Sequence, residues 1–231
     1  MPASSGLADG TDLPGWSLPA RRASSCGRVF RRTIPSETVL MKLILASASA
    51  RRAQILRDAG LSFQIISSAI DEASMEGESP QDLARRLAEQ KAQLVAARAV
   101  GPAIVIGADT VVVLDTKILG KPRSAEEARA MLEQLSGRTH AVITGIALIR
   151  LPDEATRQEV EATQVTFAPM TAEEISGYVA TGEPFDKAGA YAIQGRGGRH
   201  ITRIEGCYFN VVGLPLGKLY RLLRELGWKE S

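Results

Sequence analysis

The sequence predicts an α/β fold, because short apolar runs typical of buried strands alternate with amphipathic segments that carry helix-capping residues. The 231 residues are 45% hydrophobic and 23% charged, which suffices for one enzyme-sized core. The charges nearly cancel to a net +2, so the composition gives no general field for binding nucleic acid or an anionic membrane. Any anion site in this chain must therefore be local.

The first forty residues differ from the rest, because they are rich in Ser, Gly, Pro and Arg and lack sustained apolar periodicity. We expect them to be disordered. Their arginines would suit a transit peptide, but Asp9, Asp12 and Glu37 count against one, and no secretory apolar core is present. A start codon assigned too far upstream of Met41 is the simpler explanation, which leaves residues 41–231 as the folded domain.

Localisation follows from two further features of the sequence. No stretch approaches the roughly 18 to 20 apolar residues that a membrane helix needs. The two cysteines, Cys26 and Cys207, do not have the spacing of a zinc site or a disulfide framework. We therefore expect a cytoplasmic protein without a membrane partner.

The first elements follow from apolar runs and their flanking residues. A buried strand is predicted at residues 43–46, and a helix that ends at Gly60 follows the serine- and arginine-rich segment 47–52. A second strand is expected at residues 63–66. Ser79 then supplies an N-cap and Pro80 a first-turn proline, which predict a helix as far as residue 99.

The next strands, at residues 103–106 and 111–114, flank Asp109, which we place where a strand ends or bends. Ser124 starts a helix that ends near Gly137. The remaining elements are strands at 140–151 and 160–167, a helix at 171–180, a polar binding loop at 182–195, strands at 201–204 and 207–212, and a helix at 214–226.

The segment 47–52 lies at a strand-to-helix junction, where unpaired backbone N–H groups and the positive end of the helix dipole suit an anion. Arg51 and Arg52 add permanent charge and forked donors that match phosphate oxygens. Paired arginines on a solvated helix face are the alternative interpretation. Ser47 and Ser49 are either phosphate ligands or helix caps.

Asp109 is the strongest single candidate, because a carboxylate between two apolar strands must be solvated, paired or bound to metal. A role in a structural turn remains the alternative. Hydrolysis of a phosphoanhydride suits a hard divalent ion, for which Glu72 and Asp186 are candidate partners of Asp109. With only His140 and His200 in the chain, we expect no transition-metal cluster, and we interpret both histidines as structural or surface residues.

Three lysines, Lys91, Lys121 and Lys187, are candidate phosphate ligands, although each is also compatible with a solvent-facing position. Neither the P-loop pattern nor the dinucleotide-binding glycine spacing occurs. Residue chemistry alone therefore predicts an anion site together with carboxylates, and no more.

Five segments in this order and spacing resemble the Maf family of nucleoside triphosphate pyrophosphatases, and the resemblance covers residues 42–226. They are Leu45-Ala46-Ser47-Ala48-Ser49-Ala50-Arg51-Arg52, Gly107-Ala108-Asp109-Thr110-Val111-Val112, Gly120-Lys121-Pro122, Leu135-Ser136-Gly137 and Asp186-Lys187-Ala188-Gly189-Ala190-Tyr191. The resemblance implies an ITPase-like α/β fold, with a mixed twisted central sheet flanked by helices and a cleft between two lobes. It also implies a homodimer, a nucleoside triphosphate substrate, and a divalent cation such as Mg²⁺ or Mn²⁺.

The last segment, followed by Ile193-Gln194-Gly195, is similar to the branch of the family that acts on dTTP and UTP. The branch acting on 7-methyl-GTP typically has a cysteine in place of Lys187 and a phenylalanine in place of Tyr191. Ala50 departs from the proline that the family usually has before the arginine pair, and this implies a less rigid loop.

The resemblance also implies roles for individual residues. Asp109 is the general base or a metal-bound carboxylate, with Glu72 as a second metal ligand. Substrate discrimination belongs to Arg51, Thr110 and Gln194. The expected phosphate ligands are Ser47, Ser49, Arg52, Lys91, Lys121 and Lys187.

Two other classes of function stay open. A nucleotide-binding regulator of septum formation would bind without turnover, although the intact acidic set favours turnover. A nucleic-acid-binding protein would show a steep salt dependence, but the near-neutral charge and the 5% of aromatic residues do not favour it.

Overall fold

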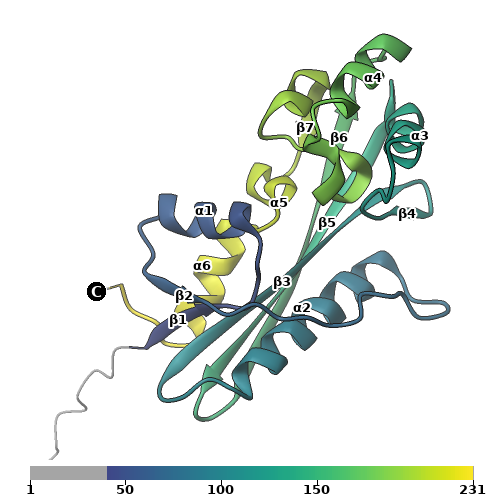
Figure 1. Cartoon of the computed structure of the whole chain (residues 1–231). Coiled ribbons are helices and arrows are strands. Elements are labelled where there is room, and N and C mark those ends of the chain that lie inside the picture. Colours follow the sequence, from purple (N-terminus) through teal and green to yellow (C-terminus); the bar gives the residue numbers. More distant parts are fainter. Residues whose placement is uncertain (1–40, 231) are drawn as a thin grey trace, which may run out of the picture. The chain divides into compact units, whose positions relative to one another are not determined.

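The computed structural model describes residues 41–230, so the expectations for residues 1–40 lie outside the described range. In this range the chain forms a seven-stranded mixed sheet with helices on both faces, which Figure 1 shows. The predicted α/β class is therefore confirmed. The strands are β1 (Lys42–Leu45), β2 (Phe63–Ile65), β3 (Ala103–Leu114), β4 (Lys117–Leu119), β5 (Thr139–Leu151), β6 (Ala155–Phe167) and β7 (Ile201–Glu205).

Six α-helices and three short 3₁₀ helices complete the part of the chain that the structure describes. None of the helices within residues 41–230 is long and apolar enough to cross a membrane. The helices are α1 (Ala50–Asp58), α2 (Pro80–Ala96), α3 (Ala125–Leu135), α4 (Ala172–Val179), η1 (Glu183–Asp186), η2 (Ala188–Ala190), η3 (Arg196–His200), α5 (Tyr208–Val212) and α6 (Leu216–Glu225).

The sheet leaves one edge of β3 partly unpaired. The strand order is β2-β1-β3-β5-β6-β7, and β4 adds to β3 on the same edge as β1. Strand β1 pairs with β3 in parallel only as far as Ile106, and β4 pairs with it antiparallel only from Val112 onward. Within the described residues, segment 107–111 of β3 is therefore paired only with β5, which runs alongside it. The candidate site lies at this unpaired segment of β3.

Two groups of helices cover the sheet, and each group has its own core. Near β1, helices α1 and α6 pack on one face of β3 around Ile104 and Ile106, and α2 packs on the opposite face around Val105. Towards β4 and β7, helices α3 and α4 pack around Val112 and Phe167. A cavity lined by residues of both groups lies between them, in agreement with the predicted cleft.

Two glycines allow α2 to lie unusually close to the sheet. A Cβ atom on Gly107 would lie 2.1 Å from the carbonyl oxygen of Ala88, and one on Gly145 would lie 2.2 Å from that of Ala84. Both carbonyls belong to α2, and Gly145 pairs directly with Asp109 across the sheet. Only glycine permits this approach, which brings side chains of α2 to the unpaired segment of β3.

Two expectations about secondary structure are wrong. Residues 103–106 and 111–114 belong to one continuous strand, because Gly107 accommodates α2 rather than ending the strand. Residues 207–212, expected as a strand, form helix α5. Here the Asn210 amide donates to the Val142 carbonyl and the Thr163 hydroxyl, and these tertiary bonds override the β-propensity of the segment.

Candidate active site

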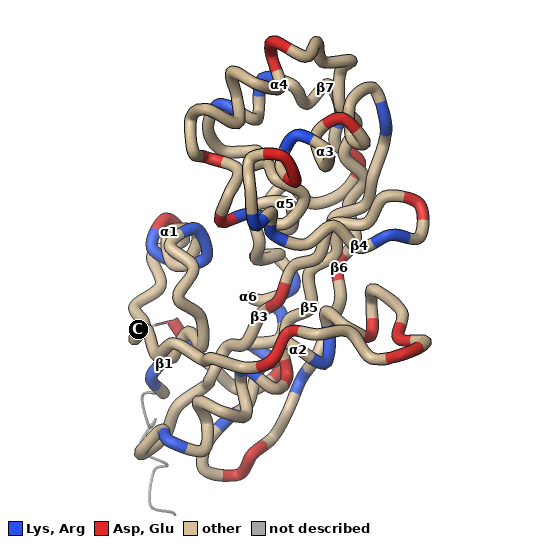
Figure 2. The backbone as a smooth tube through the Cα atoms, turned by 45° about the vertical axis from the view of Figure 1, so that its right-hand side comes forward, with Lys and Arg blue, Asp and Glu red and all other residues tan. Residues whose placement is uncertain are grey.

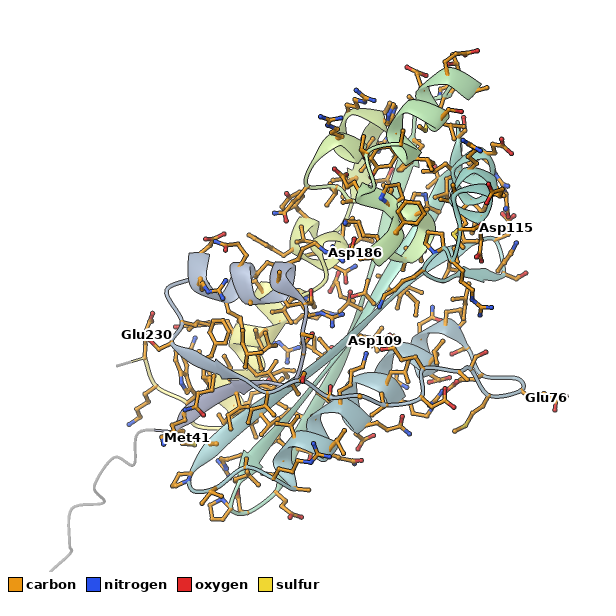
Figure 3. All side chains as sticks on the ribbon, in the orientation of Figure 1. Met41, Glu76, Asp109, Asp115, Asp186 and Glu230 are labelled. Atoms are coloured by element: carbon orange, nitrogen blue, oxygen red, sulfur yellow. The ribbon has the colours of Figure 1, made fainter. Side chains whose placement is uncertain are left out.

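A cavity of about 640 Å³ opens at the unpaired segment of β3, between the two groups of helices. Figure 3 labels Asp109 on this strand and Asp186 in the segment that follows α4. Every predicted site residue lines the cavity, namely Ser47, Ser49, Arg51, Arg52, Glu72, Lys91, Asp109, Thr110, Lys121, Lys187 and Gln194. The fold therefore brings together residues that are separated by as much as 147 positions in the sequence.

The start of α1 forms one wall of the cavity. Ser49 is the N-cap of the helix, and its hydroxyl oxygen accepts from the backbone N–H of Arg52 at 3.4 Å. The hydroxyl of Ser47 accepts from the backbone of Ser49 and from the Arg52 guanidinium, both at 3.2 Å. The interpretation of Ser49 as a helix cap is confirmed. Ser47 stabilises the strand-to-helix junction through its two hydrogen bonds.

Arg52 is buried and held by three neutral acceptors. Its Nε donates to the Gly213 carbonyl at 2.8 Å, while its terminal nitrogens donate to Ser47 and to Thr110 Oγ1, the latter at 3.0 Å. Burial lowers the pKa of Arg52 from its ordinary value, and the nearby charge of Asp109 offsets part of that effect. The guanidinium is thus fixed in place while its charge has no direct ion pair among residues 41–230.

Thr110 continues this arrangement into the sheet. Its hydroxyl lies 2.9 Å from that of Thr144, its cross-strand partner on β5. Thr144 in turn donates to the backbone carbonyl of Asn210 at 3.2 Å. A chain of hydrogen bonds therefore links Arg52 to β3, β5 and α5. The sequence pattern places Thr144 within a strand but does not indicate this role, because the side chain is fully buried among partners from other elements.

Lys91 and Asp109 form a buried part of the site, on the α2 side of β3. The Lys91 ammonium donates to Asp109 Oδ1 and to Glu72 Oε1, each at 2.6 Å. The side chains of Lys91 and Asp109 are only 8% and 10% exposed, whereas that of Glu72 is half exposed. One buried ammonium thus joins the two predicted metal ligands.

The electrostatics of Glu72 reflect this ammonium. Burial acts to raise the pKa of Glu72, but the hydrogen bond and charge of Lys91 outweigh it, with help from Lys121 and Arg52. The net result is a pKa below the ordinary value, so Glu72 stays ionised. The charged form of the Glu72 carboxylate therefore faces Lys91.

These carboxylates fit a magnesium-type ion only together with oxygens from another molecule. Within residues 41–230 no three His, Cys, Asp or Glu side chains converge on a metal position. Mg²⁺ is commonly held by one or two carboxylates and completes its shell with substrate phosphates and water. Glu72 and Asp109 supply hard oxygen donors of that kind.

Asp186 and two cations form a second charged group at the mouth of the cavity. Asp186 accepts from Arg51 at 3.2 Å and from the ammonium of its neighbour Lys187. Burial acts to raise the pKa of Asp186, but these two cations lower it overall. Among the described residues, Glu72, Asp109 and Asp186 do not form a three-carboxylate metal site, and a shared ion between Asp186 and Asp109 stays a prediction.

The loop that carries Gln194 is held by Glu183, which sequence reasoning also missed. The Glu183 carboxylate accepts from the Tyr178 hydroxyl at 2.7 Å and from the backbone N–H groups of Arg196 and Gly197. Gln194 itself is exposed and lines the cavity. The sequence around Glu183 does not indicate this role, because its hydrogen bonds form only when the loop folds back on itself.

The two histidines are structural, as interpreted from the sequence. His140 is 1% exposed and its Nε2 lies 2.7 Å from the Tyr191 hydroxyl, with Phe167 packed against its ring. Burial lowers the pKa of His140 to about 4, so the ring is neutral at physiological pH. His200 is also buried, near Tyr178.

Comparisons with known proteins show what this chain is similar to. The family profile described as Maf-like protein matches residues 42–226. A protein of Carboxydothermus hydrogenoformans named dTTP/UTP pyrophosphatase is 50% identical over 188 residues, which make up 81% of this chain and 100% of that protein. A protein of the same name from a Geobacillus species is 52% identical, over 82% of this chain and 100% of its own length. Among solved structures, the Staphylococcus aureus Ham1 protein aligns with 80% of this chain and 99% of its own at 14% identity and a TM-score of 0.43.

Proposed function

The chain belongs to the Maf family, and on that premise we propose that it hydrolyses dTTP and UTP to the nucleoside monophosphate and pyrophosphate. Relatives named dTTP/UTP pyrophosphatase are about half identical to it over their whole length. The observation that carries the proposal is the cavity at β3, where a fixed, unneutralised Arg52 and a buried Asp109 lie at one unpaired strand segment. The first can hold phosphate, and the second can accept a proton.

The triphosphate binds to the cations of the cavity. Arg52 offers the remaining N–H groups of its fork, and Lys121 and Lys187 supply point charges at the rim. The N-terminus of α1 contributes its positive dipole end, next to Ser47 and Ser49. These groups hold the outer phosphates and take up the charge that develops on the leaving pyrophosphate.

Asp109 receives the proton of the attacking water. Its Oδ1 is held by Lys91, whereas Oδ2 accepts no hydrogen bond from residues 41–230. A water oxygen forms the new bond to the α-phosphorus while the bond from that phosphorus to the bridging oxygen breaks. The proton passes to Asp109, and the bridging oxygen leaves with pyrophosphate. A divalent ion held by Glu72, Asp109 and phosphate oxygens would supply Lewis-acid polarisation and charge neutralisation.

Base selection falls to Gln194, Arg51 and Thr110. The Gln194 amide carries both a donor and an acceptor, which suits the edge of uracil or thymine. Arg51 reaches the cavity from the same helix as Arg52 and is oriented by Asp186. Thr110 acts through the position of Arg52, because its hydroxyl is already bonded to that guanidinium and to Thr144.

A nucleotide panel tests the proposal. Purified protein with Mg²⁺ or Mn²⁺ should release pyrophosphate and monophosphate from dTTP and UTP faster than from 7-methyl-GTP or purine nucleotides. Asp109→Asn should keep nucleotide affinity while turnover falls by about 10²–10⁴-fold, the usual contribution of a general base. Nucleotide binding without pyrophosphate release across the panel would instead support a non-catalytic regulator. The resemblance also implies a homodimer, which light scattering of the same preparation measures.

A further inference from the structure

We infer that Lys91 occupies the cation position between Glu72 and Asp109 in the nucleotide-free protein, so that a divalent metal enters together with the nucleotide rather than before it. The inference rests on the proposed function and adds an order of binding to it. It also gives Lys91 a role other than that of a simple phosphate ligand. The starting point is the pair of 2.6 Å bonds from one ammonium to two carboxylates.

The position of Lys91 is fixed by the packing of α2. The helix lies against β3 and β5 where Gly107 and Gly145 remove the Cβ atoms that would hold it away. Lys91 belongs to the buried face of α2, and its ammonium is almost fully enclosed with Asp109. A buried ion pair of this kind is strongly held, because withdrawing one partner leaves a charge without compensation.

The charge of the whole cavity also disfavours a free cation. Five basic side chains line it against three acidic ones, so two positive charges are in excess; the residues are Arg51, Arg52, Lys91, Lys121 and Lys187 against Glu72, Asp109 and Asp186. Such a cavity attracts a triphosphate and repels an uncomplexed divalent ion. Only two carboxylates contact Lys91, and among residues 41–230 no three ligating side chains converge to hold the ion without a nucleotide.

A bound nucleotide removes both obstacles to metal binding, the excess positive charge of the cavity and the shortage of ligands. Its phosphates bring negative charge, and they give the Lys91 ammonium other oxygens to bind. Glu72 is half exposed and can turn towards an incoming ion without disturbing the core, whereas Asp109 stays fixed in β3. Metal and nucleotide therefore raise each other's affinity, as thermodynamic linkage requires.

Mn²⁺ binding to the protein itself tests the inference without any measurement of activity. Water-proton relaxation enhancement distinguishes protein-bound Mn²⁺ from Mn²⁺ on a free nucleotide, and a dTTP analogue with a methylene group between the α and β phosphorus atoms prevents turnover. In the wild-type protein, Mn²⁺ affinity should be at least about tenfold higher with the analogue than without it, in the range of typical coupling between ligands.

Two lysine variants distinguish the effect of the bridging Lys91 ammonium on Mn²⁺ affinity from the effect of the overall charge of the cavity. Lys91→Met should raise Mn²⁺ affinity of the nucleotide-free protein by about tenfold or more, since it frees both carboxylates. Lys121→Met removes the same charge from the cavity, but Lys121 has no carboxylate within ion-pair distance among residues 41–230, so its effect should be much smaller.

Equal effects of the two variants would overturn the inference, as would wild-type protein that binds Mn²⁺ equally well with and without the analogue. The wild-type comparison needs no variant, so it decides the matter even if Lys91→Met fails to fold. Pyrophosphate release from dTTP, measured on the same preparation, tests the proposed function separately. Active enzyme that binds Mn²⁺ tightly on its own would refute only the order of binding.

Discussion

Arg52 and Lys91 are both buried cations at the same unpaired segment of β3, but they lie on opposite faces of the strand and have opposite kinds of partners. Three neutral oxygens hold Arg52, from Gly213, Ser47 and Thr110. Two carboxylates hold Lys91. The first arrangement fixes a positive charge without neutralising it, whereas the second neutralises it. Arg52 therefore keeps a buried charge without an ionic partner, whereas in the nucleotide-free protein the Lys91 ammonium is paired with the protein's own carboxylates.

The alternation of side chains along β3 produces this difference. Thr110 faces α1 and therefore meets Arg52, whereas Asp109 faces α2 and therefore meets Lys91. Both faces open into one cavity only because β1 and β4 leave the segment between them unpaired. Figure 2 shows basic and acidic residues spread over the whole described chain. Arg52 and Lys91 therefore differ in their local partners and not in the net charge of the region around them.

The largest effect should follow a change in the Arg52 arrangement. Arg52→Lys keeps one charge but removes the fork that Gly213, Ser47 and Thr110 hold, so we expect kcat/KM for dTTP to fall by about 10²–10³-fold. Arg57→Lys, on an exposed face of the same helix, is the control and should be nearly neutral. An Arg52→Lys variant within a few-fold of wild type would mean that this guanidinium does not bind substrate.

The Lys91 arrangement depends on the close approach of α2, which Gly145→Ala should disturb. The added methyl group would lie 2.2 Å from the Ala84 carbonyl oxygen, so we expect the free energy of unfolding to fall by about 1–3 kcal/mol in urea denaturation. Gly120→Ala meets no atom within 4 Å and should change stability far less. Equal stabilities of the two variants would contradict the proposed role of α2 packing.

Thr144→Val tests the uncharged hydrogen-bond network that holds Arg52. It removes the hydroxyl that bonds to Thr110 and to the Asn210 carbonyl. We expect kcat/KM to fall by roughly fivefold to tenfold, in line with about 1 kcal/mol for such a bond. Thr144→Ser should restore activity, which a packing defect alone would not predict. Thr139→Val removes a similar but exposed hydroxyl pair and serves as the control.

The smallest effect is a change in the pKa of Glu72. In the wild-type protein this pKa lies below its ordinary value of 4.5, so Glu72 stays ionised, and keeps its stabilising contribution, until the pH falls through the lowered value. Lys91→Met removes the main cause, whereas burial, which raises the pKa, remains. Carbon-detected NMR titration should therefore show the Glu72 pKa rising in the variant, and an unchanged pKa would mean that Lys91 is not its main partner.

Local patterns predicted most of the fold, and residue chemistry together with the family resemblance named residues that the fold brings to one cavity. The Ser79 and Ser124 caps lie where expected, because their hydrogen bonds are local. The roles of Thr144 and Glu183 could not be predicted, because each depends on partners brought close by strand register or by loop folding. The continuity of β3 through Gly107 depends on α2 in the same way.

The most direct test of the central claim is hydrolysis of dTTP in ¹⁸O-labelled water, followed by mass spectrometry of both products. If water attacks the α-phosphorus, a single ¹⁸O atom should appear in the nucleoside monophosphate and none in pyrophosphate. Label in pyrophosphate, or release of orthophosphate in place of pyrophosphate, would contradict the account.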